Sequence, residues 1–146
     1  MAMMRSRMVS VAALLVAAAA AVGLGQAKDA TQHRIVFEVT GEAQSWESVL
    51  NNVENAQKAL GAEATEIRVI AHGQGLGLVL QSNSAMAERI ARISTPQVKF
   101  AACENSMRRM KVVKEDLLPA VVTVDSGVAE VVRLQEAGWS YLKSGS

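Results

Sequence analysis

The chain has 146 residues, 50% of them hydrophobic, and a formal charge of +1 from 15 basic and 14 acidic side chains. This balance excludes a protein that neutralises a nucleic-acid backbone, so we expect no nucleic acid as a partner. One cysteine and two histidines exclude an internal disulfide and any multi-cysteine metal cluster, and an aromatic content of 3% disfavours a planar cofactor, so we expect no metal and no cofactor.

The first 27 residues have the layout of a secretory signal peptide. Two arginines precede an apolar run from Val9 to Leu24, and Gly25 and Ala27 occupy the positions that a signal peptidase reads. The run is about 16 residues long, short of the roughly 20 that span a bilayer. We expect cleavage near Ala27, which leaves residues 28–146 as one periplasmic or secreted domain without stable membrane insertion.

The rest of the chain alternates strands with helices. β-Branched and aromatic residues predict strands at 33–40, 65–72, 98–103, 120–124 and 139–142. Apolar residues three or four apart predict helices at 45–60, 84–93, 105–112 and about 126–137. The expected amino-terminal caps are Ser45, Asn83 or Ser84, and Asp125 or Ser126. Such alternation is typical of parallel βαβ units, so we predict an α/β fold with helices on both faces of the sheet.

Reactive groups in such a fold gather beyond the carboxyl ends of the strands. Those ends here are Glu38 to Thr40, His72, Cys103 and Asp125. The only cysteine, one of the two histidines and a carboxylate therefore share one edge of the predicted sheet. We take Cys103, His72 and Asp125 as the candidate site residues.

Cys103 is the main candidate for chemistry. It ends an apolar strand and stands at the entrance to a helix, where unpaired N–H groups favour the thiolate over the thiol. A thiolate at a strand end can take part in persulfide, disulfide-exchange or acyl chemistry. The alternative is a small buried hydrophobe, which is how most lone cysteines behave.

His72 has two interpretations. It acts as a proton acceptor for Cys103 if their strands are neighbours, or it is a turn residue bonded to its own loop. Asp125 completes a Cys–His–Asp arrangement in a further alternative, although no oxyanion-hole motif is legible.

Three glycines follow His72, at positions 73, 75 and 77. Their spacing matches neither the P-loop nor the dinucleotide fingerprint, so we favour a tight turn over nucleotide binding. Ligand or nucleotide binding by this glycine-rich segment remains a third functional hypothesis beside the two given below.

Three segments together resemble the DsrE/DsrF-like family, and in particular its small exported members: VIAHGQGL at 69–76, VKFAACENSM at 98–107, and the run from Lys114 to Lys143. The resemblance extends from about Ile35 to Lys143. It implies a three-layer α/β/α domain with a five-stranded, mainly parallel sheet, commonly assembled into homo-oligomers. Better-understood branches of the family relay sulfur as a cysteine persulfide, and Cys103 matches the reactive cysteine that follows their third strand.

Two functions of different classes follow. In the first, the chain is a sulfur carrier, sulfurtransferase-like if it is active, which takes sulfur on Cys103. Its partners are then sulfur donor and acceptor proteins or small thiols. In the second, the chain is a non-enzymatic binding or oligomeric assembly module in which Cys103 only packs.

Overall fold

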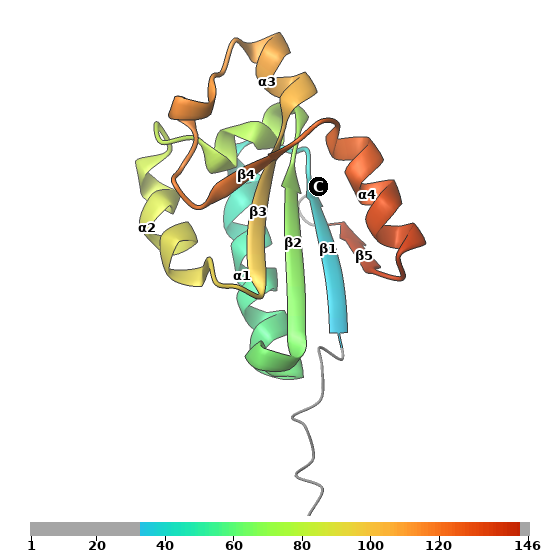
Figure 1. The fold of residues 1–146 in the computed structure, drawn as a ribbon. Helices are drawn as coiled ribbons and strands as arrows, with labels where there is room; N and C mark the ends of the chain where they lie inside the picture. The colour runs from blue at the N-terminus through green and yellow to red at the C-terminus, as the bar shows by residue number, and fades with distance from the viewer. Residues whose placement is uncertain (1–32, 144–146) are drawn as a thin grey trace, which may run out of the picture.

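The computed structural model describes residues 33–143, and the predicted leader at 1–27 lies outside them. Strands alternate with helices along the chain (Figure 1). The strands are β1 (His33–Val39), β2 (Thr65–Ala71), β3 (Val98–Cys103), β4 (Val121–Val124) and β5 (Ser140–Lys143). The α-helices are α1 (Ala43–Leu60), α2 (Ser84–Ile93), α3 (Glu104–Met110) and α4 (Gly127–Glu136). Short 3-10 helices are η1 (Ala62–Ala64), η2 (Gly73–Val79) and η3 (Lys114–Asp116).

The strands form one five-stranded sheet in the order β4-β3-β2-β1-β5, and every described pair is parallel. The predicted α/β fold is therefore confirmed. Ala71 of β2 pairs with Ala102 of β3, so the residues that follow them in the chain, His72 and Cys103, lie at the same edge. That register positions the two candidate residues side by side at the carboxyl end of the sheet.

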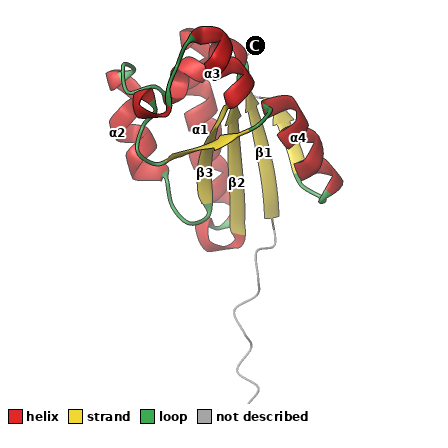
Figure 2. Ribbon diagram, turned by 45° about the horizontal axis from the view of Figure 1, so that its top comes forward, coloured by secondary structure: helices red, strands yellow, loops and turns green. Residues whose placement is uncertain are grey.

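Helices cover the two faces of the sheet unequally, which gives three layers (Figure 2). On one face, α1, α2 and η2 enclose the larger core, whose fully buried side chains include Phe37, Leu50, Leu76, Ile90 and Phe100. On the other face, α4 packs on a smaller cluster of Val36, Ile70, Ala101 and Val131. α3 lies beyond the carboxyl ends of the strands (Figure 1).

The helix starts differ in part from the predicted caps. α1 begins at Ala43, so the prediction that Ser45 caps it is wrong: Ser45 lies in the first turn and its hydroxyl donates to the Glu42 carbonyl at 2.7 Å. Asn83 precedes α2, but its side-chain amide donates to the Leu78 carbonyl instead of capping the helix. Ser126 caps α4 as predicted, accepting from the Ala129 N–H at 3.4 Å.

The glycine-rich segment is a 3-10 helix rather than an open loop. Gly73 has φ of 57°, which glycine adopts without strain. A Cβ on Gly75 would lie 2.0 Å from the Val39 carbonyl oxygen, and one on Gly77 would lie 2.4 Å from the Trp46 ring. Close packing of η2 on β1 and α1 therefore accounts for Gly75 and Gly77, and the left-handed backbone accounts for Gly73.

Within residues 33–143, no helix is both long enough and apolar enough to span a membrane.

Candidate functional site

Cys103 lies at the junction between strand and helix. It is the last residue of β3 and the residue that precedes α3, with no loop between the two elements. Cys103 is only 4% exposed, yet it borders a cavity of about 200 Å³. The cavity is lined by polar or ionisable side chains and one valine: His72, Cys103, Asn105, Ser106, Arg109, Ser126 and Val128.

The surroundings of the thiol favour its ionised form. Burial raises the pKa of Cys103, but hydrogen bonds from the Gly127 backbone, from the backbone and hydroxyl of Ser106, and from the Asn105 backbone lower it by more. The pKa therefore lies below the usual value for a cysteine. These donors come from the first turns of α3 and α4, two segments far apart in sequence. A lowered pKa increases the fraction of thiolate, which is the nucleophilic form.

Ser106 connects the thiol to the glycine-rich helix. Its hydroxyl oxygen accepts a hydrogen bond from the Gly73 N–H at 2.9 Å. The hydroxyl keeps its own proton for donation, and a hydrogen bond from it to the thiol is one of those that lower the pKa of Cys103. η2 thus fixes a donor of the thiol as well as packing the core.

His72 is held by a carboxylate on the neighbouring strand. Its Nε2 lies 2.7 Å from Oε1 of Glu38, and the Tyr141 hydroxyl donates to the other oxygen, Oε2, at 2.6 Å. Burial raises the pKa of Glu38, but the hydrogen bonds from Tyr141 and His72 lower it by more, so the carboxyl is ionised at neutral pH. An ionised carboxylate only accepts, so His72 carries a proton on Nε2.

The structure brings two of the three predicted residues together. Cys103 and His72 line one cavity, whereas Asp125 is absent from its lining. The Asp125 carboxylate instead accepts two hydrogen bonds from Arg133, at 2.8 and 2.9 Å, which lower its pKa to about 2. The structure therefore does not form the Cys–His–Asp arrangement, and Glu38 is the carboxylate beside His72. The sequence signal for Glu38 was a polar residue near the end of a buried strand.

The contact between Tyr141 and Glu38 can be tested by titrating the phenol. The hydrogen bond to Glu38 raises the pKa of Tyr141 from 10.0 to about 12, because the carboxylate stabilises the phenol and repels the phenolate. Tyr141 is the only tyrosine in the chain, so tyrosinate absorbance reports on it alone. We expect the native chain to retain the phenol near pH 11, and Glu38→Gln to shift the titration to lower pH. Identical titration curves for the two folded proteins would contradict this contact.

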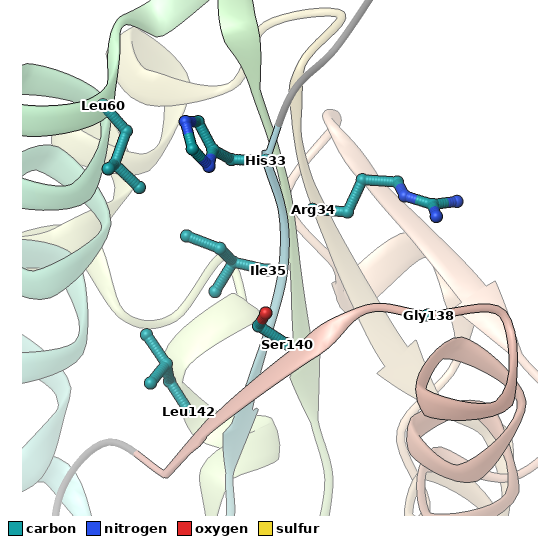
Figure 3. A pocket seen from close by; sticks show the side chains of 7 residues that line it. All are labelled: His33, Arg34, Ile35, Leu60, Gly138, Ser140 and Leu142. Carbon is teal, nitrogen blue, oxygen red and sulfur yellow. The ribbon is translucent and has the colours of Figure 1, made fainter.

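A separate cavity of about 340 Å³ lies beside the amino end of β1. It is lined by residues of β1, α1, β5 and the turn before β5: His33, Arg34, Ile35, Leu60, Gly138, Ser140 and Leu142. Figure 3 shows Arg34 directed away from the side on which Leu60 and Ile35 lie. None of the three predicted site residues borders this cavity. Within residues 33–143, no group of three His, Cys, Asp or Glu side chains is placed to hold a metal ion.

The fold and the site define a small parallel α/β domain with a hydrogen-bonded cysteine at the carboxyl edge of its sheet. Residues 33–144 match the DsrE/DsrF-like family, and the chain belongs to this family, which is linked to sulfur relay. The resemblance to the DsrE/DsrF-like family predicted from the sequence is confirmed.

Two solved structures are similar to this chain. A protein of unknown function from Methanobacterium thermoautotrophicum, MTH1491, is 28% identical, with a TM-score of 0.66 over 76% of this chain and 98% of that one. The ychN protein from E. coli is 15% identical, with a TM-score of 0.57 over 76% of this chain and 98% of that one, and shows the fold alone. No curated protein matches the chain.

Proposed function

We propose that the chain is a sulfur carrier that holds a sulfane sulfur as a persulfide on Cys103. The observation that carries this proposal is the position of Cys103 at the end of β3, on a small cavity that His72 and Ser106 also line. Hydrogen bonds that lower the pKa of the thiol support it. Membership of a family linked to sulfur relay supports it. A structural cysteine needs no such donors, because an un-ionised thiol packs as a small apolar group.

The transfer is a displacement at sulfur. The Cys103 thiolate attacks the outer sulfur of a persulfide donor, R–S–SH, so that a new S–S bond forms to Sγ while the S–S bond of the donor breaks. The donor leaves as the thiolate R–S⁻, and Cys103 carries the S–SH group. With thiosulfate as donor the leaving group is sulfite. An acceptor thiolate then attacks the outer sulfur, which returns Cys103 to its thiolate and leaves the persulfide on the acceptor.

The size of the cavity suits this cargo. Its volume is about 200 Å³, below the roughly 300–1,000 Å³ of pockets that enclose drug-sized ligands. His72 lines the same cavity, and its Nε2 is bonded to Glu38, so Nδ1 is the ring nitrogen that remains to accept a hydrogen bond. In this proposal Cys103 carries the sulfur and His72 accepts the thiol proton.

We place the carrier outside the cytoplasm, in the periplasm or secreted, on the signal-peptide layout of residues 1–27. Its partners there are sulfur donor and acceptor proteins or small thiols. Cys103 is the only cysteine in the chain, so it has no internal partner with which to form a disulfide in an oxidising compartment.

Loading of the folded chain with sulfur tests the proposal. The chain is incubated with thiosulfate or with a small persulfide, the donor is removed, and the intact mass is measured. We expect the native chain to gain one sulfur atom, and the matched Cys103→Ser variant to gain none. A native chain that keeps its original mass with both donors would contradict the carrier.

One observation favours assembly as a second function. Three valines are exposed on β4 and α4, namely Val122, Val128 and Val132. We propose that a second copy of this chain covers them, which makes the protein a homo-oligomer. Sedimentation of the native chain should then show an oligomer that Val128→Ser combined with Val132→Ser weakens and Cys103→Ala leaves intact. A native chain that sediments as a monomer at micromolar concentration would contradict this assembly.

A further inference from the structure

Arg109 borders two cavities at once. It lines the cavity that contains Cys103, and it lines a second cavity of about 450 Å³ together with Gly73, Gln74 and Met110. Arg109 lies three residues after Ser106 on α3, so both residues share the face of the helix that borders the thiol. The two cavities therefore have Arg109 in common.

Within residues 33–143, no carboxylate neutralises the charge of Arg109. Neither cavity has an aspartate or glutamate in its lining, and no described carboxylate forms a salt bridge with Arg109. Its neighbour Arg108 differs: its guanidinium donates to the Asn105 side chain, and it lines another cavity that also contains Glu104. A cation beside the thiol and open to solvent suits a negatively charged ligand.

We propose that Arg109 makes this site selective for small anionic sulfur donors. The outer sulfur of the donor meets Cys103 in the smaller cavity, and its carboxylate or sulfonate oxygens accept hydrogen bonds from Arg109 at the entrance to the larger one. This inference rests on the proposed sulfur carrier. Attack by a thiolate on an anion brings two negative charges together, and a guanidinium between the cavities offsets their repulsion.

Both thiosulfate and the persulfide of a carboxylate-bearing thiol have this chemistry. Their sizes separate them, because thiosulfate fills only the space around Arg109 and Cys103, whereas the larger persulfide also extends toward Gly73 and Gln74. Loading the chain with each donor in turn distinguishes the two sources.

Alkylation of Cys103 measures the selectivity without requiring any persulfide. The full chain is treated at low salt with iodoacetate, an anion, and with iodoacetamide, its neutral counterpart, and the two rates are compared as a ratio. A change in the thiolate fraction of Cys103, or in the access of reagents to its sulfur, affects both rates alike and cancels in the ratio. We expect Arg109→Gln to lower the ratio about five- to tenfold, a size typical of one partly screened charge. Arg108→Gln removes the same charge one residue away and should leave the ratio within about twofold.

Three results would overturn the inference. The first is an unchanged ratio in Arg109→Gln. The second is an equal fall of the ratio in Arg109→Gln and Arg108→Gln, which would indicate only the overall positive potential of α3. The third is a native Cys103 that reacts with neither reagent, which would contradict the sulfur carrier as well. Normal alkylation selectivity without sulfur loading would instead contradict the carrier alone and leave the anion preference standing.

Discussion

Gly75→Ala is expected to destabilise the domain by about 3 kcal/mol or more, the upper end of the cost of overpacking. The new Cβ would lie 2.0 Å from the Val39 carbonyl oxygen and 2.9 Å from the Thr40 nitrogen. Both atoms belong to the backbone at the end of β1, a strand with partners on both sides, so no flexible side chain can move aside. Urea unfolding of the native and variant chains measures the difference.

Gly73→Ala is the matched control in the same 3-10 helix. Its Cβ would lie 3.9 Å from the Thr40 oxygen, which is ordinary contact, so its cost comes only from a φ of 57°. A left-handed alanine costs about 1–2 kcal/mol. A smaller loss for Gly75→Ala than for Gly73→Ala would contradict the close approach of η2 to β1.

Ser106→Ala is expected to raise the pKa of the Cys103 thiol and to slow its alkylation at neutral pH. The variant removes a hydroxyl that donates to the sulfur, and a hydrogen bond to a charged group contributes about 1.5–3 kcal/mol. We expect a rate at neutral pH that is lower by about tenfold. At neutral pH the variant has the smaller thiolate fraction and therefore the slower alkylation. The rates of the native chain and the variant differ below the raised pKa and converge above it, where both thiols are ionised. The pH dependence of the iodoacetamide rate measures this shift.

Ser126→Ala tests whether any hydroxyl in the cavity has this effect. Ser126 lines the same cavity, but its oxygen accepts from the Ala129 N–H and caps α4. Its loss should cost about 0.5–2 kcal/mol of stability and leave the alkylation profile in place. Superimposable profiles for the native chain and Ser106→Ala would contradict the role of Ser106.

Much of this site follows from local sequence patterns. The apolar strand ending at Cys103 and the apolar strand before His72 were both predictable, and parallel strands bring their carboxyl ends to one edge. A helix was also predicted at 105–112, one residue short of the observed start at Glu104, so donors from α3 could be anticipated. What the pattern left open was the strand order, which the observed β2–β3 pairing resolves.

The partners of His72 depend on distant contacts that no local pattern encodes. Tyr141 reaches Glu38 only because β5 pairs with β1, and the two residues are 103 positions apart. Asp125 was a reasonable candidate at a strand end, but Arg133 lies two turns along α4 and binds its carboxylate. The donor from Gly127 likewise depends on where α4 packs, which its amphipathic pattern does not specify.

Transfer of sulfur away from Cys103 tests the carrier most directly. The chain is loaded with one sulfur, freed of donor, and treated with an acceptor thiol, and both the protein mass and the acceptor persulfide are measured. We expect each chain to lose one sulfur atom and an equal amount of persulfide to appear on the acceptor. Release of the sulfur as sulfide, with a mixed disulfide left on Cys103, would contradict it.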